Sequence, residues 1–299
     1  MDPNLESLFG VWAQPLSETE DEKCENAVGM VKKASAASSA LNGRTIRVFA
    51  QGSYRNNTNV RAESDVDVAV CCSDTVNLDF TFSPSLDKYK VGFSDATDTA
   101  QQLRTEVGEA LRSYFGRDGV SEGNKAFDVH SNSYRVDADV VPCIEHRRYT
   151  SEYSWETGTA LYPKSSIAPI INWPEQHYAN GVAKNNATGY NFKRLVRIVK
   201  NIRNTMGDEG IPEAGPIPSY LIECLVFNVP NVGFLHPTYS ADVRYILSYL
   251  YAQTSTDAAC HEWGEVNELK YLFRMSQPWT RVGANAFLAR AMNRLAIAT

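Results

Sequence analysis

The chain has 299 residues, 43% hydrophobic and 21% charged, an ordinary globular composition with ample material for a core. Its net charge of −6 and scattered basic residues exclude the dense positive surface that a sensor of long duplex DNA or RNA requires. No apolar run approaches the roughly 18 residues of a membrane span, and the N-terminus lacks a signal-peptide pattern. We therefore expect a cytoplasmic protein without membrane contact. Six cysteines without a Cys-x-x-Cys pair, and five scattered histidines, predict neither a zinc site nor a disulfide framework.

The first predicted element is a long helix over 18–41, which opens with a Ser-Glu-Thr-Glu run suited to a helix N-terminus. Residues 45–49 follow as a strand, because β-branched and aromatic residues crowd them. This strand ends at Gly52-Ser53. At such a turn, glycine lets the backbone approach a phosphate and serine adds a hydroxyl donor.

Residues 64–71 are predicted as a second strand, in which Asp65 and Asp67 share one face and valines share the other. Two carboxylates about 7 Å apart along a strand repel each other unless a cation lies between them. Hard oxygen ligands of this kind suit a divalent metal. An Asp-x-Asp pair alone is common on solvated strand faces, so the preceding strand and its Gly-Ser turn are what favour a metal site.

The next segments continue the alternation of strand and helix. A Pro- and Asp-rich insertion over 73–99 leads into a helix over 98–115, with Asp98 or Thr99 as its N-cap. Residues 134–141 form another alternating strand, which places Asp137 and Asp139 on one face. After residue 149 the strand signals fade and the chain becomes mostly helical, over 189–206, 239–252, 257–275 and 283–298, with a loop at 207–218.

The helix over 189–206 carries an apolar stripe and a separate basic cluster. The stripe recurs with helical spacing at Phe192, Leu195, Val196, Val199, Ile202 and Met206. Lys193, Arg197 and Lys200 fall within roughly 60° of one another on another face. Taken alone, this cluster would be read as a solvated basic face. Ser219-Tyr220 follow the helix after the loop.

These motifs together resemble a known enzyme superfamily. A strand ending in Gly-Ser, an Asp-x-Asp strand and a later strand aspartate resemble the DNA polymerase β-like nucleotidyltransferases. The basic helix followed by Ser-Tyr narrows the resemblance to the branch of cyclic GMP–AMP synthase, oligoadenylate synthetase and the bacterial CD-NTases. Residues 170–204 are most similar to the CdnE-like group of these enzymes, and the similarity runs from about residue 45 to 230.

The resemblance implies an α+β fold, with a polymerase β-like nucleotidyltransferase lobe, a helical C-terminal lobe and the active site in the cleft between them. On this basis we divide the chain into an N-terminal helical segment at 1–44, a catalytic core at 45–150 and a helical domain at 151–299.

The resemblance also implies a metal-dependent reaction, in which a hydroxyl attacks the α-phosphorus of a nucleoside triphosphate and pyrophosphate leaves. Two Mg²⁺ ions, which Mn²⁺ can replace, would be held by Asp65, Asp67 and Asp139. Asp137 is the alternative third ligand, but the family motif of Asp, two apolar residues and Pro matches 139–142 better.

The family pattern carries a second set of residues over to nucleotide binding, namely Gln51, Gly52, Ser53, Lys193, Lys200, Ser219, Tyr220 and Asn172. Lys193 and Ser219 would contact the triphosphate, and Tyr220 would stack on the donor base, with ordinary core packing as its alternative. Lys200 has a surface charge as its alternative. Asn172 aligns with a position where asparagine accompanies uridine use, and the alternative is that it caps a turn before Trp173.

The function that the resemblance implies is a cyclic dinucleotide or trinucleotide synthase. It would use ATP and a second triphosphate such as UTP, and its product would activate a separate effector protein in antiphage signalling. One alternative is a nucleotidyltransferase acting on a protein, small-molecule or RNA acceptor, although an RNA-tailing enzyme should show a basic path for its primer. The other is an inactive nucleotide-binding scaffold, which three retained carboxylates argue against.

Overall fold

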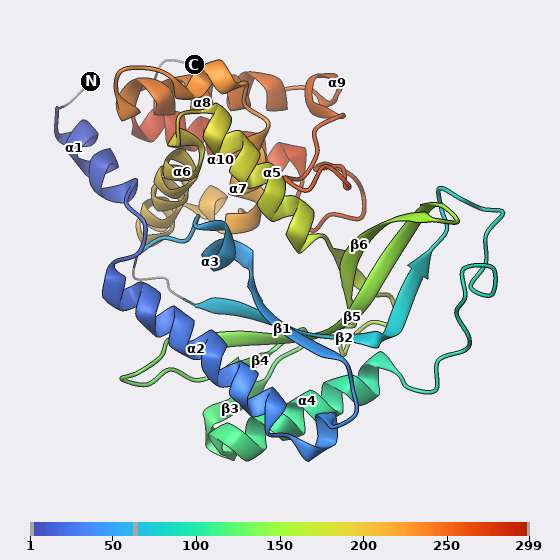
Figure 1. Cartoon of the computed structure of the whole chain (residues 1–299). Coiled ribbons are helices and arrows are strands. Elements are labelled where there is room, and N and C mark those ends of the chain that lie inside the picture. The colour runs from blue at the N-terminus through green and yellow to red at the C-terminus, as the bar shows by residue number, and fades with distance from the viewer. Residues whose placement is uncertain (1–2, 62–64, 298–299) are drawn as a thin grey trace. The chain divides into compact units, whose positions relative to one another are not determined.

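The structure is a computed structural model that describes residues 3–61 and 65–297 (Figure 1). Contacts within these residues group them into two compact units. The sheet unit comprises 17–55 and 65–174, and the helical unit comprises 3–16, 56–61 and 175–297. Each is described by itself. The predicted α+β class is confirmed, whereas the division at residues 44 and 150 stays a prediction.

The sheet unit contains the strands and three of the α-helices described here. Its strands are β1 Ile46–Gln51, β2 Val66–Asp79, β3 Val120–Glu122, β4 Phe127–Val129, β5 Ala138–Ser151, β6 Ser154–Leu161 and β7 Ile170–Asn172. Its helices are α2 Glu18–Ala36, α3 Gly52–Asn56 and α4 Ala100–Phe115, with 3₁₀ turns η1 Ser39–Leu41 and η2 Arg117–Gly119.

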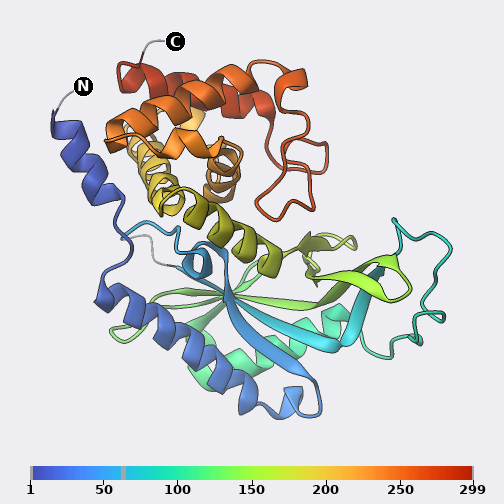
Figure 2. The same ribbon diagram turned by 45° about the horizontal axis from the view of Figure 1, so that its top comes forward.

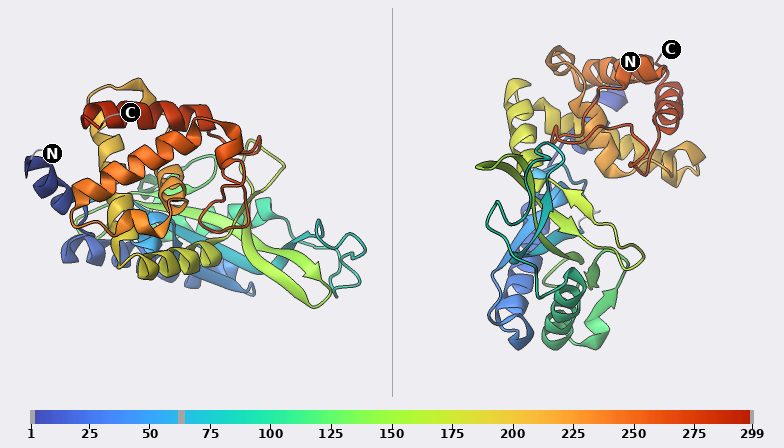
Figure 3. Two further views of the ribbon diagram at one scale, coloured as in Figure 1. Left: turned by 90° about the horizontal axis from the view of Figure 1, so that it is seen from above. Right: turned by 90° about the vertical axis from the view of Figure 1, so that its right-hand side faces the viewer.

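The strands form one mixed sheet in the order β1-β2-β5-β4-β3, and β6 pairs with the later part of β5 and with β7. The pair β2–β5 is parallel and lies side by side along its length (Figure 3), whereas the other pairs are antiparallel. Figure 2 shows α2 and α4 on the same side of the sheet. Buried side chains of both helices pack there against alternate residues of β2, including Val66 and Val68. The opposite face of β2 carries Asp67.

Local sequence explains where the helices of this unit begin. The Ser17 hydroxyl accepts a hydrogen bond from the Glu20 backbone N–H, and the Glu20 carboxylate accepts one from the Ser17 N–H, which is a complete capping box. Thr99, rather than Asp98, is the N-cap of α4, because its hydroxyl accepts from the Gln102 N–H.

Two expectations about the later elements are wrong. Strands continue beyond residue 149 as β6 and β7, and the first part of β6 gives no alternating signal because it is exposed throughout. Gly158 permits the β6–β7 pairing, since a β-carbon there would lie 2.8 Å from the Trp173 ring. The predicted helix over 257–275 is helical only at Asp257–Cys260. The chain then folds back on itself, with Glu268 in the left-handed region at φ 57° and a β-bridge between Gly264 and Tyr271.

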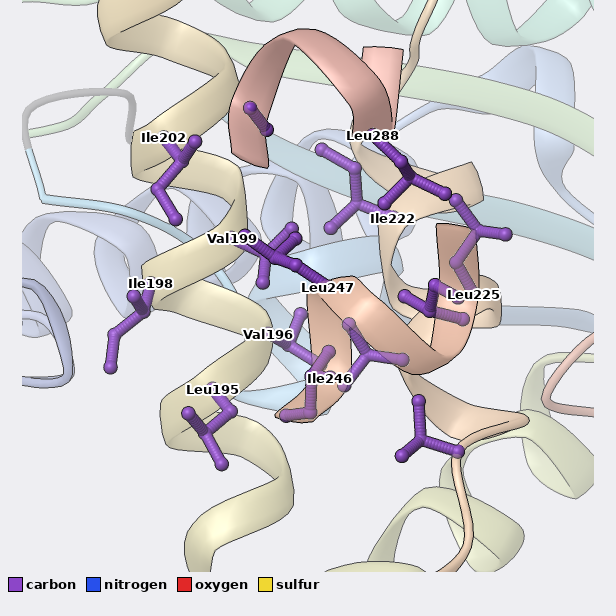
Figure 4. Packing of buried hydrophobic residues seen from close by; sticks show 14 of the residues in the cluster. Leu195, Val196, Ile198, Val199, Ile202, Ile222, Leu225, Ile246, Leu247 and Leu288 are labelled. Carbon is purple, nitrogen blue, oxygen red and sulfur yellow. The ribbon is translucent and has the colours of Figure 1, made fainter. Parts of the chain in front are cut away.

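The helical unit consists of α1 Pro3–Trp12, α5 Pro174–Ala187, α6 Asn191–Asp208, α7 Ser219–Phe227, α8 Tyr239–Thr254, α9 Asp257–Cys260 and α10 Arg281–Arg294, with 3₁₀ turns η3 Pro212–Ala214 and η4 Asn231–Phe234. The predicted apolar stripe of α6 is buried, and Figure 4 shows Val196, Val199 and Ile202 among side chains of α7, α8 and α10. Across 3–61 and 65–297, no helix combines the length and hydrophobicity needed to cross a bilayer.

Candidate active site

A row of polar side chains crosses the sheet on the face opposite α2 and α4. Gln51 of β1 pairs with Asp67 of β2, Asp67 with Asp139 of β5, and Asp139 with Asp128 of β4. Residues paired in register point to the same side of a sheet, so three carboxylates follow one another across neighbouring strands. Asp128 was not predicted, because its strand of three residues is too short to show any period.

Asp137 and Asp139, the two candidates for the third carboxylate, have different environments. Asp137 lies immediately before β5, and its carboxylate accepts a hydrogen bond from the Ser131 N–H at 2.6 Å. The Asp139 carboxylate accepts no hydrogen bond from the residues that the structure describes, and it lies in the row beside Asp67. The geometry therefore favours Asp139 as the metal ligand, in agreement with the motif.

The charge environment of Asp139 favours a bound cation. Although the residue is exposed, partial desolvation of its carboxyl and then the charges of Asp128, Asp65 and Asp137 raise its pKa above the usual range. A divalent ion placed among these carboxylates would reverse that shift, since it would replace repulsion by attraction.

Gly52 shapes the other side of the row. Its φ of 63° is left-handed, and a β-carbon would overlap Oδ2 of Asp67 and lie 2.9 Å from Cγ. Only glycine therefore allows the backbone of the Gly-Ser turn to approach the carboxylate so closely. Ser53 follows as the second residue of α3. The structure thus brings Gln51, Gly52 and the Asp67–Asp139 pair together within the sheet unit.

The donor set fits Mg²⁺. Asp67 and Asp139, with Asp65 immediately before β2, would hold the ions through oxygen ligands, and bound Mg²⁺ would lower the pKa of an attacking hydroxyl and neutralise a triphosphate. Within the described part of the chain, no three acidic, histidine or cysteine side chains already lie close enough to chelate an ion.

The predicted phosphate-binding residues lie at the beginnings of two helices of the helical unit. Lys193 is near the start of α6, where it is half-buried with its ammonium 5.6 Å from the centre of the Tyr178 ring. Burial lowers the pKa of Lys193. Ser219 is the first residue of α7, and its hydroxyl accepts a hydrogen bond from Nη2 of Arg203 at 2.7 Å. That bond uses a lone pair of Ser219 and leaves its O–H available to donate to a phosphate.

Tyr220 is fixed at its hydroxyl but open at its ring. The hydroxyl donates to Oε2 of buried Glu265 at 2.7 Å, and the ring centre lies 5.4 Å from that of His177 and 5.9 Å from that of Trp279. Because 36% of the residue is exposed, simple core packing does not describe it. Sequence reasoning missed Arg203 and Glu265, which contact Ser219 and Tyr220 from 16 and 45 residues away.

Lys200 and Asn172, the two remaining residues predicted to bind nucleotide, lie in different environments. Lys200 is only 2% exposed and donates to the Thr58 carbonyl at 2.9 Å, so the alternative of a surface charge is wrong. Asn172 ends β7 and is half-buried, and no hydrogen bond to its side-chain amide occurs among residues 3–61 and 65–297. The turn-capping alternative for Asn172 therefore has no support in the structure.

A mixed sheet with a carboxylate row beside a Gly-Ser turn, together with a helical unit bearing lysine and Ser-Tyr, defines a nucleotidyltransferase of the polymerase β-like class. Residues 179–296 match the family described as the cGAS/DncV-like nucleotidyltransferase C-terminal helical domain. With the relatives described next, this match shows that the chain belongs to the bacterial CD-NTases, in the CdnE group of cyclic nucleotide synthases.

The similarity to CdnE proteins extends over almost the whole chain. A cyclic dipyrimidine nucleotide synthase CdnE from Legionella pneumophila is 45% identical, covering 97% of this chain and 98% of its own length. Another protein of that name, from Cecembia lonarensis, is 39% identical over 95% of this chain and 96% of its own. The solved structure of a CdnE cyclic dinucleotide synthase from Elizabethkingia meningoseptica with GTP and Apcpp is 35% identical, with a TM-score of 0.81 and coverage of 97% of this chain and 98% of that one.

These findings confirm the predicted family, fold and enzyme class. The chain is a nucleotidyltransferase of the cyclic nucleotide synthase type, and nucleoside triphosphates are its substrates. The roles of the individual site residues stay predictions.

Proposed function

We propose that this enzyme makes a cyclic dinucleotide containing at least one pyrimidine, with UTP as the source of a uridine. The observation that carries the proposal is the side-chain amide of Asn172 at the end of β7, which makes no hydrogen bond among the described residues. Its one donor and one acceptor group match O4 and N3–H of uracil. Because a flipped amide could also pair with adenine or cytosine, the chemistry of the amide alone does not select the base.

Similarity to known synthases supports the pyrimidine. The two CdnE relatives described above, at 45% and 39% identity, are both named cyclic dipyrimidine nucleotide synthases. The Elizabethkingia enzyme was solved with GTP and the ATP analogue Apcpp, at 35% identity. Base choice therefore varies within the group, and we retain ATP as a candidate second substrate.

In the proposed reaction each residue set has its own task. Asp65, Asp67 and Asp139 would hold Mg²⁺, while the Gly52 N–H and the Ser53 hydroxyl would hold the end of the triphosphate. Lys193 and Ser219 would add positive charge and a hydroxyl donor to the phosphates. Tyr220 would stack its exposed ring on the donor base. Catalysis would then rest on positioning and on stabilising the charge that develops on phosphate oxygens.

The test is incubation of the purified protein with Mg²⁺ and labelled ATP, GTP, CTP and UTP, singly and in pairs. We expect a phosphatase-resistant product that contains uridine, with altered base preference in Asn172→Ser. Asn42→Ser is the matched control, because Asn42 is an exposed asparagine of the same unit. Exclusively purine products from the wild type, or an unchanged base preference in Asn172→Ser, would contradict the proposal.

The same experiment separates the alternative functions. Label transferred to added RNA or protein would indicate an acceptor other than a nucleotide, and the absence of any product would indicate a scaffold. From the family resemblance we further propose that the product activates a separate effector protein in antiphage signalling. A cytoplasmic location fits the six buried free cysteines, since free thiols are typical of reducing compartments.

A further inference from the structure

The segment that joins the two sequence motifs of the sheet unit is anchored by buried charges in the helical unit. Gly52-Ser53 precede this segment and Asp65-Asp67 follow it, whereas its described residues 56–61 belong to the helical unit. Interactions that fix 56–61 therefore restrict the chain that leads directly from Gly52-Ser53.

Thr58 is the point of attachment. Lys200 of α6 donates from Nζ to the Thr58 carbonyl at 2.9 Å and lies 3.3 Å from its hydroxyl oxygen. The Thr58 hydroxyl in turn donates to Oε2 of Glu223 on α7 at 2.7 Å. His177 of α5 completes the cluster, with Nε2 2.9 Å from the other Glu223 oxygen. Two helices, α6 and α7, thus hold Thr58 directly, and α5 holds its partner Glu223.

The cluster is fully enclosed, which makes its completeness important. Thr58 has no exposed surface, and the exposed fractions of the Lys200 and Glu223 side chains are 2% and 4%. Burial opposes ionisation of Glu223, but His177, Lys200 and the Thr58 hydrogen bond outweigh it and lower its pKa to about 2. Removing one partner from a buried charge strongly destabilises the folded protein. Moving Thr58 away would remove a partner from both Lys200 and Glu223, so Thr58 is held in place.

Two local features of the connecting segment are uncommon. Asn57 has a left-handed backbone at φ 52°, and its carbonyl is held by Nη1 of Arg197 at 2.5 Å. The side-chain amide nitrogen of Asn59, Nδ2, is buried without a hydrogen-bond partner in the described structure. Such features persist where the surroundings over-determine them, and they occur frequently at functional sites.

We propose that Thr58 is a positioning residue, which with Lys200 and Glu223 fixes the segment between the two motifs and so holds Gly52 and Asp67 in their reactive arrangement. This role rests on the proposed catalytic function of those motifs. It gives Lys200 a task within the protein, since its ammonium already binds Thr58. Thr58 acts through its neighbours and need not contact the substrate.

The test compares Thr58→Val with Thr58→Ser and with Thr254→Val. Valine keeps the shape of threonine but removes the hydroxyl bond to Glu223, whereas serine retains that hydroxyl. Thr254 is the matched control, because it is also fully buried in the helical unit and donates to the Leu250 carbonyl at 2.7 Å. Pyrophosphate release from an equal mixture of the four triphosphates gives an apparent kcat and KM for each variant without assuming which bases are used.

We expect Thr58→Val to lower kcat about tenfold or more with little change in KM, because small misplacements of reacting groups slow chemistry strongly. Thr58→Ser should restore most of the rate. Thr254→Val should keep the wild-type rate even if its melting temperature falls as much as that of Thr58→Val. Equal loss of kcat in Thr58→Val and Thr254→Val, or an unchanged kcat in Thr58→Val, would overturn the proposal. If Thr58→Val does not fold, Thr58→Ala carries the same expectation.

Hydrogen exchange provides a readout that does not depend on activity. Peptides covering 52–67 should exchange faster in Thr58→Val than in the wild type and stay unchanged in Thr254→Val. If the wild type releases no pyrophosphate, the proposed function fails, whereas the exchange of these peptides still decides whether Thr58 anchors the segment. Unchanged exchange in Thr58→Val would overturn the anchoring role.

Discussion

Gly52 and Asp67 are in such close contact that the space for a side chain on the first is filled by the carboxylate of the second. A β-carbon at Gly52 would overlap Oδ2 of Asp67. The Gly-Ser turn and the Asp-x-Asp strand, which are separate signals in the sequence, are therefore one structural unit. The glycine of the motif is needed both for its left-handed φ of 63° and for this lack of a side chain.

Gly52→Ala should therefore abolish activity while the protein stays folded. We expect a loss of at least 100-fold in kcat, since the methyl group would displace either Asp67 or the turn that approaches the triphosphate. Pyrophosphate release measures the rate, and circular dichroism confirms the fold.

Gly43→Ala is the control for backbone strain in this experiment. Gly43 also has a positive φ, 84°, but nothing lies within 4 Å of the position of its β-carbon. The Gly43→Ala variant should lose about 1 kcal/mol of stability and keep its activity. If both variants lost activity alike, strain rather than the contact with Asp67 would be the cause.

Asp139→Asn should abolish activity and, in the absence of metal, raise the melting temperature at pH 7. The raised pKa of Asp139 means that ionisation of this carboxyl costs folding free energy as pH rises above its unfolded pKa near 4. The neutral amide removes that cost, so the gain should fade as the pH is lowered. Thermal melts between pH 3 and 7 with a chelator measure it.

Asp137→Asn is the comparison for that variant. The amide oxygen can still accept the hydrogen bond from Ser131, so the fold and most of the activity should remain. An inactive Asp137→Asn together with an active Asp139→Asn would show that the third ligand is Asp137.

Tyr220 should bind nucleotide mainly through its ring. Tyr220→Ala should weaken binding of a non-hydrolysable triphosphate by about 1–3 kcal/mol, or roughly 5- to 150-fold, the range for loss of base stacking. Tyr220→Phe keeps the ring and loses only the hydroxyl's hydrogen bonds, the one it donates to Glu265 and the one it accepts from Asn267, so its effect should be smaller. Isothermal titration of both variants tests this order, and equal losses would indicate that the hydroxyl, not stacking, matters.

His146 should make the sheet unit sensitive to acid. Burial lowers its pKa to about 4, so the unfolded chain takes up a proton near pH 6.5 while the folded chain does not. Stability should fall by roughly 3 kcal/mol as the pH drops from 6.5 to 4. Urea unfolding of the wild type and His146→Gln across this range isolates the effect, because other groups titrate alike in both. A variant at the exposed His261 should keep the full dependence.

Strong periodicity made the central elements of this fold predictable from the sequence. The alternating valines of β2 and the apolar stripe of α6 correspond to the faces that are buried. Pairings between distant segments were not predictable. Asp128 lies in the carboxylate row only because β4 pairs with β5, and Glu265 anchors Tyr220 only because the chain after α9 folds back. The helix predicted over 257–275 was wrong because its composition is compatible with a helix, whereas the long-range contacts that fold this segment back cannot be seen in the sequence.

The helical unit is assembled from stretches at both ends of the chain, 3–16 and 175–297, which has a consequence for biosynthesis. Residues 17–55 and 65–174, which form the sheet unit, leave the ribosome long before α10, which packs on α8 to complete the helical unit. At the usual pace of translation, α1 waits on the order of tens of seconds for α6 and α8, with Phe9, which they bury, still uncovered. A nascent chain released near residue 174 would thus present a foldable sheet with an unprotected hydrophobic helix at its front, a natural substrate for chaperones.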